Sequence, residues 1–401
     1  MSFYGLIVSQ FLILNFLLAK TTYVSNRITT TVIFIEQPEL IKSHGYQVEI
    51  HNVVTEDGYI LEIHRLPYGR TNDQRNFNNG KQPVLIQHGL VGSSADWILM
   101  GPGRSLPYML VDAGYDVWLG NNRGNVYSKS HISLLPTDRH FWNFSYHELG
   151  MYDVPATIDY IINQTNCEQI FYIGHSQGTT QFWVTMSQKP DYNAKIKLMI
   201  SLAPVAFTGN LRGPIIILVK LLYLTVQISE DLGYSEIYSK SIFEDNYQDI
   251  SIKFFIQNMI FSFAGFNRTS VNATDLASIM NDIPAGASWK ELVHFSQGYI
   301  YPGNFRQFDY GNDEKNYRMY NSVQPPEYKL DKIIAPIAFF SSVDDIIATK
   351  PDVSLLKTKL HNLVFHKEIS IKSFSHYDFL WAPSAMSVVF KPTLDLLVLY
   401  D

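Results

Sequence analysis

Short apolar runs recur along the chain, and each of them ends at a turn or at the start of a helix-like stretch. The runs cover residues 82–87, 115–119, 169–173, 337–340 and 363–369. Helix-like segments such as residues 152–163 lie between them, and this alternation predicts a mostly parallel sheet joined by crossover helices. Residues 47–67 instead alternate apolar and polar positions around Gly58, which predicts an antiparallel hairpin at the sheet edge.

The strand pattern stops near Pro204, and helical segments follow from about residue 207 to residue 330. Two of them, residues 214–228 and 250–263, are rich in Ile, Leu, Val and Phe. Apolar helices of this kind belong to a core by default. We therefore expect an α/β domain made of residues 20–206 and 331–401, interrupted by a helical insertion at residues 207–330.

Composition limits the classes of partner. The chain has 401 residues, of which 46% are hydrophobic and 17% charged, and a formal net charge of −6. This length and hydrophobic content suffice for a large core and exclude a disordered chain. The negative net charge and the lack of a Lys/Arg block argue against nucleic acid and against a polybasic membrane patch. We expect a small or neutral substrate.

The first residues indicate export. Residues 1–19 are apolar with isolated polar positions and shorter than the roughly 20 residues that a membrane span needs. They predict a secretory signal peptide, with an uncleaved anchor as the alternative, and no transmembrane segment in the mature chain. Four sequons, at Asn143, Asn163, Asn267 and Asn272, are candidate glycosylation sites. The single cysteine, Cys167, excludes an intramolecular disulfide, and we expect it to be a buried free thiol.

The most specific chemical signal is Gly174-His175-Ser176-Gln177-Gly178, which lies between an apolar run and a helix-like stretch. This pattern is typical of a nucleophile elbow, a tight strand-to-helix turn that projects a serine hydroxyl. The two glycines let strand and helix pass close to each other. The helix N-terminus adds partial positive charge where an oxyanion would form. Ser176 is therefore the candidate nucleophile.

A serine hydroxyl needs a histidine that takes its proton and an acid that orients this histidine. On sheets of this kind the chain order is Ser, then Asp or Glu, then His. Beyond the helical insertion, the run at residues 337–340 leads into Asp344 and Asp345, and His376 follows in a later loop. His376 is the candidate base, and either aspartate is a candidate acid.

Two backbone N–H groups are expected to bind the oxyanion. One belongs to Gln177, the residue after the serine, and the other to the loop Gln87-His88-Gly89-Leu90, which points to Leu90. His88 is expected to fix this loop rather than to act as a catalyst. Metalloprotease, zinc-thiolate and P-loop patterns are absent from the sequence, so we expect neither a metal nor a nucleotide cofactor. With the elbow present, the apolar insertion can either line an acyl-chain site or be plain core.

These motifs closely resemble the acid lipase family, the group that contains gastric lipase, lysosomal acid lipase and many insect members. Besides the elbow, the matching stretches are residues 45–46, 55–61, 87–90, 120–125, 141–150, 294–297 and 305–311. The resemblance implies an α/β-hydrolase fold with a helical cap and a secreted or lysosomal location. It also implies hydrolysis of neutral lipid esters, such as triacylglycerols or cholesteryl esters, at a lipid–water interface.

Carried over by residue, the resemblance implies Ser176 as nucleophile, Asp345 as acid and His376 as base. The chain departs from the family in two places. The cap cysteine pair of some relatives is missing, and the usually glycine-rich acidic turn reads Ser341-Ser342-Val343-Asp344, which leaves Asp344 as a competitor. Two other functions stay open: an esterase or thioesterase that acts on shorter acyl groups, and an inactive lipid-binding or storage protein on the same fold.

Overall fold

The computed structural model describes residues 37–70, 81–237 and 273–401. Within these residues nine strands form one sheet, in the order β1-β2-β4-β3-β6-β7-β10-β11, with β5 paired to β2. The strands are β1 (Glu49–Val54), β2 (Tyr59–Leu66), β3 (Pro83–Gln87), β4 (Asp116–Leu119), β5 (Ser130–His131), β6 (Ile170–His175), β7 (Ile196–Leu202), β10 (Ile337–Ser342) and β11 (Leu363–Ile369). The segments at residues 1–19 and 250–263, for which the sequence made predictions, lie outside the described residues.

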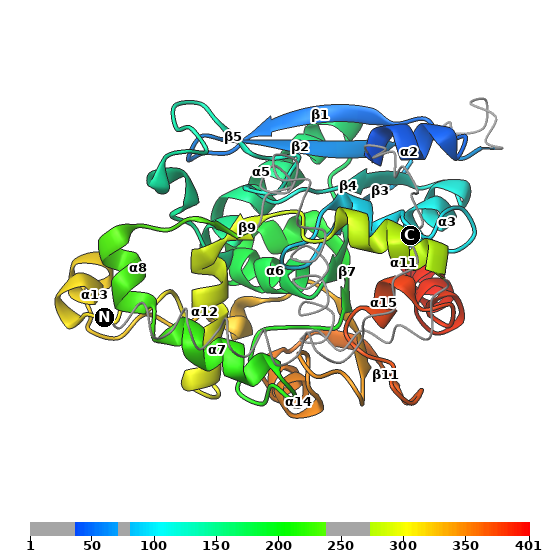
Figure 1. The fold of residues 1–401 in the computed structure, drawn as a ribbon. Coiled ribbons are helices and arrows are strands. Elements are labelled where there is room, and N and C mark those ends of the chain that lie inside the picture. The colour runs from blue at the N-terminus through cyan, green and yellow to red at the C-terminus, as the bar shows by residue number, and fades with distance from the viewer. Residues whose placement is uncertain (1–36, 71–80, 238–272) are drawn as a thin grey trace, which may run out of the picture. The chain divides into compact units, whose positions relative to one another are not determined.

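The strands from β4 to β11 run parallel, whereas β1 and β2 are antiparallel additions at one edge. Figure 1 shows β1 and β2 along this edge. Because parallel strands end on the same side of a sheet, the loops after β3, β6, β10 and β11 come together there. All the residues predicted to form the triad or the oxyanion site follow one of these strands.

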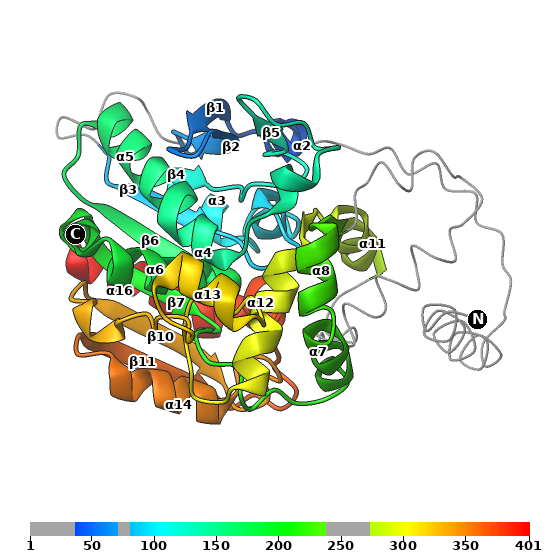
Figure 2. The same cartoon turned by 90° about the vertical axis from the view of Figure 1, so that its left-hand side faces the viewer.

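Helices flank the sheet. Those of the sheet domain are α2 (Gln37–Ser43), α3 (Leu106–Asp112), α4 (Tyr146–Glu148), α5 (Val154–Thr165), α6 (Gln177–Gln188), α14 (Lys350–Lys359), α15 (Asp378–Trp381) and α16 (Lys391–Tyr400). Helices α5 and α6 pack side by side (Figure 2), and α16 packs on β7. The segment between β7 and β10 contains α7 (Ile215–Tyr223), α8 (Val226–Leu232), α11 (Ala273–Asp282), α12 (Trp289–Ile300), α13 (Asp313–Tyr320) and the short pair β8 (Glu236–Ile237) and β9 (Ala287–Ser288).

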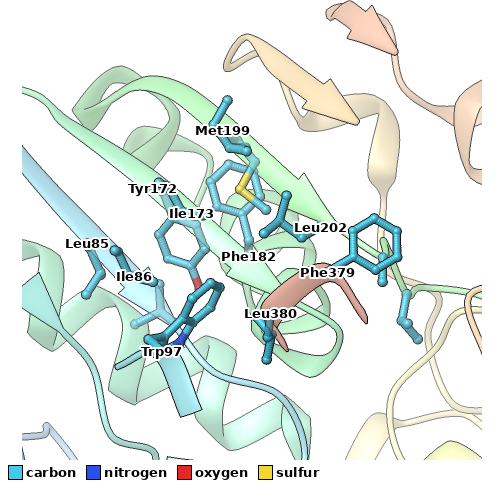
Figure 3. Close-up of a cluster of buried hydrophobic side chains, with 14 of the residues drawn as sticks. Leu85, Ile86, Trp97, Tyr172, Ile173, Phe182, Met199, Leu202, Phe379 and Leu380 are labelled. Atoms are coloured by element: carbon cyan, nitrogen blue, oxygen red, sulfur yellow. The ribbon is translucent and has the colours of Figure 1, made fainter. Parts of the chain in front are cut away.

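The core lies directly beneath the predicted elbow. Figure 3 shows its side chains on β3 (Leu85, Ile86), β6 (Tyr172, Ile173), β7 (Met199, Leu202) and α6 (Phe182), all of them fully buried. Strands covered on both faces carry continuous apolar runs rather than alternating ones. This is why the sequence of β3 and β6 predicted them so clearly.

The predicted α/β class is confirmed, and the five apolar runs correspond to β3, β4, β6, β10 and β11. The hairpin is confirmed as β1 and β2. The sequence analysis missed β7, in which Lys197 interrupts the apolar run and reaches the carboxylate of Asp401. The segment at residues 214–228 is not one helix, because a turn that Thr225 closes onto the carbonyl of Leu222 separates α7 from α8.

We still propose that residues 207–330 form a cap, which is inserted into the sheet domain of residues 20–206 and 331–401. Strand β7, which precedes this segment, and β10, which follows it, pair directly with each other in parallel. This pairing supports the proposal that the segment is an insertion between two neighbouring strands of the sheet. In Figure 2, helices α7, α8, α11 and α12 lie together on one side of the sheet.

A buried arginine joins the edge hairpin to the helix layer. Arg123 is 1% exposed and binds both oxygens of Asp57 in the hairpin turn, at 2.5 and 2.8 Å. Its Nε donates to Asp153 at 2.7 Å, and its guanidinium lies 3.9 Å from the ring centroid of Tyr59. Burial raises the pKa of Asp153 to about 6 although Arg123 opposes the shift. The buried charges of Arg123 and Asp153 therefore depend on each other, because loss of either leaves the other buried without its partner.

Replacing this arginine tests the point. Arg123→Met should lower the free energy of unfolding by about 3–5 kcal/mol, because it leaves the carboxylate of Asp153 buried without a cation. The control is Arg318→Met on α13, where Arg318 pairs with Glu314 at the surface and the expected loss is below about 0.5 kcal/mol. Urea unfolding of both variants measures the difference. Equal losses would contradict the role of this cluster.

Candidate active site

The predicted elbow is a sharp turn in the structure. Strand β6 ends at His175, helix α6 begins at Gln177, and Ser176 between them has φ 53° and ψ −120°. A Cβ on Gly174 would lie 2.8 Å from the backbone of Gly178, and one on Gly178 would lie 2.4 Å from the carbonyl oxygen of Gln87. Only glycine fits either position. Ser176 therefore has a left-handed backbone that packing on both sides enforces.

Three residues from different loops form a hydrogen-bonded chain. The Oγ of Ser176 lies 2.7 Å from Nε2 of His376, and Nδ1 of the same ring lies 2.9 Å from Oδ2 of Asp345. His376 is 2% exposed and Asp345 is fully buried. With Nδ1–H donating to the carboxylate, Nε2 is left as the acceptor for the serine proton.

The two adjacent aspartates have different surroundings. Oδ1 of Asp345 also accepts the N–H groups of Ile347 and Ala348, at 2.8 and 2.9 Å. Burial alone would raise the pKa of this carboxyl, but His376 and the two N–H groups outweigh it, so the pKa is lowered. Asp344 is half-buried, and its carboxylate accepts the N–H of Ser373 at 2.7 Å. Asp345, not Asp344, contacts the histidine.

The loop after β3 passes directly beside the elbow. A Cβ on Gly89 would lie 3.2 Å from the Cβ of Ser176, so the next residue, Leu90, starts close to the serine. Gln177 is the first residue of α6, and the first N–H groups of a helix have no acceptor within it. The two N–H groups predicted to bind an oxyanion thus belong to segments that meet at Ser176.

His88 fixes this loop. Its Nδ1 lies 2.7 Å from the carbonyl oxygen of Gly89, and its Nε2 accepts the N–H of Asn122 at 3.0 Å. Burial lowers its pKa to about 4, so the ring is neutral. The side chain of Asn122 in turn accepts from Gln87 at 2.6 Å. The sequence analysis assigned no role to Asn122, although it lies in a stretch that carried the family resemblance.

His175 forms a hydrogen bond with the backbone of His376. Its Nε2 donates to the carbonyl oxygen of His376 at 2.9 Å, and the two ring centroids lie 5.0 Å apart. Burial, followed by the nearby His376, lowers the pKa of His175 to about 3. A neutral ring at this position fixes the backbone of the loop that carries His376 without adding charge. The residue before the candidate nucleophile thus has a contact that sequence reasoning did not reveal.

A second serine–histidine pair lies between β10 and β11. The Oγ of Ser341 is 2.8 Å from Nε2 of His366, but Nδ1 of this ring faces the ammonium of Lys357 at 3.0 Å. Burial, followed by Lys357, lowers the pKa of His366. With a cation in the place where a triad has its carboxylate, this pair is not arranged to activate a serine.

The remaining predicted sites divide between described and undescribed residues. Asn143 and Asn163 are exposed, while Asn267 and Asn272 lie outside the described residues. Cys167 is a free thiol, but the expectation that it is buried is wrong: it is partly exposed in the turn after α5. Across the described ranges, no cluster of three potential metal ligands occurs. In the same ranges, no helix is both long and apolar enough to cross a membrane.

Comparison with known proteins agrees with this geometry. Residues 37–101 match a family model described as a partial alpha/beta-hydrolase lipase region, and residues 82–219 match the alpha/beta hydrolase fold. Among solved structures, a monoacylglycerol lipase of Paleococcus ferrophilus is similar in fold, with a TM-score of 0.50 and 16% identity over 85% of this chain and 99% of that one.

Three relatives match the chain over most of its length. They are the gastric triacylglycerol lipase of Rattus norvegicus (36% identical, 90% of each chain), Lipase 3 of Drosophila melanogaster (39%, 90% of this chain and 93% of that one) and the lysosomal acid lipase/cholesteryl ester hydrolase of Homo sapiens (37%, 90% of each). The match includes both the sheet strands and the segment between β7 and β10. The chain belongs to the acid lipase family of α/β-hydrolases.

Proposed function

We propose that the chain is a serine lipase that hydrolyses carboxylic ester bonds of neutral lipids, triacylglycerols and cholesteryl esters among them. The observation that carries this proposal is the chain of contacts from Ser176 through His376 to Asp345. The names of the gastric and lysosomal relatives support the choice of substrate. Ser176 is the proposed nucleophile, His376 the base and Asp345 the acid.

The geometry supports the following course for the first half of the reaction. As Oγ of Ser176 attacks the ester carbonyl carbon, its proton passes to Nε2 of His376. The negative charge on the former carbonyl oxygen is bound by the N–H groups of Leu90 and Gln177. Collapse of this intermediate breaks the ester C–O bond, and His376 returns the proton to the departing alcohol.

Water completes the cycle. It gives a proton to His376 and attacks the acyl carbon, the acid is released, and Oγ of Ser176 takes the proton back. Asp345 accepts Nδ1–H throughout, so it stabilises the imidazolium that forms in each half. The lowered pKa of Asp345 keeps its carboxyl ionised for this purpose.

An exposed apolar stripe supports a substrate at a lipid–water interface. It consists of Ile217 and Leu221 on α7, Leu224 in the turn after α7, and Ile228 and Leu232 on α8, which are 39–71% exposed. Within each helix, the spacing of four residues places the two side chains on the same face. Val219 and Leu222 of α7 point the other way and are buried. Such a face favours contact with lipid over contact with water.

The location we propose is outside the cytosol, either secreted or in the lysosomal lumen. The names of the relatives include both gastric and lysosomal lipases. The sequons at Asn143 and Asn163 are at exposed positions, where a glycan is accommodated. At Asn143 the side-chain oxygen accepts from Lys290 at 2.9 Å, and a glycan on the side-chain nitrogen leaves this acceptor in place.

Ser176→Ala should abolish ester hydrolysis, with a loss in kcat of ~10³-fold or more, because it removes the nucleophile. The measurement is turnover of a dissolved ester, alongside a thermal unfolding curve that checks the fold. Ser341→Ala is the matched control and should stay near the wild-type rate. A folded Ser176→Ala protein with normal turnover would refute the proposed function.

The adjacent acids make a second test. Asp345→Asn should lower kcat by up to ~10⁴-fold, because the amide no longer fixes the histidine tautomer or stabilises the imidazolium. Asp344→Asn should stay within a few-fold of wild type, since the carboxylate of Asp344 accepts the backbone N–H of Ser373 and does not contact His376. Steady-state kinetics of both variants measure the difference. A reversed order would assign the acid to Asp344.

The apolar stripe predicts a dependence on the physical state of the substrate. Leu224→Glu should reduce hydrolysis of an emulsified long-chain triacylglycerol by roughly tenfold or more, because the charge resists burial in lipid. Hydrolysis of a dissolved acetate ester should change little. The control is Leu399→Glu on α16, a residue that is 76% exposed but far along the chain from the stripe. An equal loss on both substrates would mean that this stretch is structural and does not contact lipid.

A further inference from the structure

The side chain of Gln177, the residue after the proposed nucleophile, forms a hydrogen bond with a residue of the proposed cap. Nε2 of Gln177 donates to Oε2 of Glu291 at 2.6 Å, and both residues are at most 2% exposed. Glu291 lies in the first turn of α12, which is 114 residues away in the sequence. The contact therefore joins the first residue of α6, whose N–H is a proposed oxyanion donor, to the helix that follows β9.

The other side of Glu291 is held firmly. Its Oε1 accepts the N–H of Ser288 at 2.8 Å, as the acid of a capping box that begins α12. The hydroxyl of Ser288 in turn donates to the carbonyl oxygen of Trp142 at 2.5 Å. The first turn of α12 thus fixes one oxygen of the Glu291 carboxyl, and the other oxygen contacts Gln177. The position of the Gln177 side chain is therefore determined by the start of α12.

We propose that Glu291 is a positioning residue for ester hydrolysis, which fixes Gln177 and through it the N–H that binds the oxyanion. This inference rests on the proposed function and adds a residue to it. Glu291 acts through Gln177 and does not itself contact the reacting atoms. Oxyanion stabilisation is sensitive to the placement of its donors, so loss of this contact lowers kcat more than it changes KM.

The charge state of Glu291 suits this position. Its pKa is raised to about 8, because burial, with a smaller contribution from Asp153, outweighs the N–H of Ser288, Gln177 and Arg123, which lower it. Below about pH 8 the carboxyl is therefore neutral. A neutral group next to an oxyanion donor does not oppose the negative charge that develops in the transition state.

The charged groups around Glu291 explain why it stays neutral. Arg123 is occupied by Asp57 and Asp153. On its own helix, Lys290 directs its ammonium to Asn143 and towards the ring of Phe308, and burial lowers the pKa of His294 to about 3. No cation in the described residues forms an ion pair with Glu291.

A second capping box provides the contrast. Ser145 and Glu148 begin α4 in the same way as Ser288 and Glu291 begin α12. Burial opposes the ionised form here too, but Lys290 and His147 outweigh it and lower the pKa of Glu148 to about 2. Two glutamates with the same local motif thus differ in charge, Glu148 being ionised and Glu291 neutral, and only the neutral one contacts the elbow.

The test compares kcat and KM for a dissolved ester across pH 5–9.5. In wild type, kcat should fall by roughly tenfold above about pH 8, because ionised Glu291 places a negative charge against the side chain of Gln177, the residue whose N–H binds the oxyanion. Glu291→Leu should lower kcat by ~10-fold or more at pH 6 with little change in KM, since Gln177 loses its partner. Glu291→Gln keeps one acceptor oxygen, so it should recover part of this loss, and it should show no fall above pH 8 because it has no carboxyl to ionise.

Glu148→Gln is the matched control: it should lower the melting temperature but leave the pH profile of kcat as in wild type. Should Glu291→Leu fail to fold, the pH profile of Glu291→Gln still decides. The positioning role is overturned if Glu291→Leu keeps the wild-type kcat, or if Glu291→Gln keeps the wild-type fall above pH 8. A wild-type chain that hydrolyses no ester refutes the proposed function instead, so the two failures are distinct.

Discussion

The close passage of strand β6 and helix α6 at Gly174 and Gly178 is the constraint on which the site depends. A single Cβ at Gly178 would meet the carbonyl oxygen of Gln87 at 2.4 Å, so β3, β6 and α6 touch through backbone alone. This contact forces the left-handed turn at Ser176, brings the loop at Gly89 alongside and exposes the first N–H of α6. Figure 3 shows the buried side chains of β3, β6, β7 and α6 that hold these elements against one another.

Four histidines of the described residues differ in role because their ring nitrogens have different hydrogen-bond partners. His376 has a carboxylate on one side and the serine on the other. His88 and His175 meet backbone groups, and burial keeps both neutral, so they fix loops. His366 meets an ammonium where a triad has its acid. A serine close to a histidine is therefore not sufficient for catalysis. The group at Nδ1 of the histidine, a carboxylate for His376 and an ammonium for His366, determines whether Nε2 can accept the serine proton.

Much of this was predictable from the sequence, because it depends on local patterns. Buried parallel strands are continuous apolar runs, the elbow is a five-residue motif, and strand ends determine where Asp345 and His376 meet Ser176. What could not be predicted depends on residues far apart in the chain. The contact of Gln177 with Glu291, the ring of contacts around Arg123 and the different charge states of Glu148 and Glu291 all arise only when separate elements pack. Strand β7 was missed because a single lysine interrupts its run, although neighbouring strands bury the rest of it.

The central claim is that packing at the elbow makes Ser176 the activated serine among the residues that the structure describes. The most direct measurement is to treat the chain with a long-chain phosphonate ester, which forms a stable covalent bond with an activated serine, and to locate the adduct by peptide mass spectrometry. We expect one adduct per chain, on the peptide that contains Ser176, and a lasting loss of esterase activity in proportion to labelling. An adduct on Ser341, or complete loss of activity with Ser176 unmodified, would contradict the account.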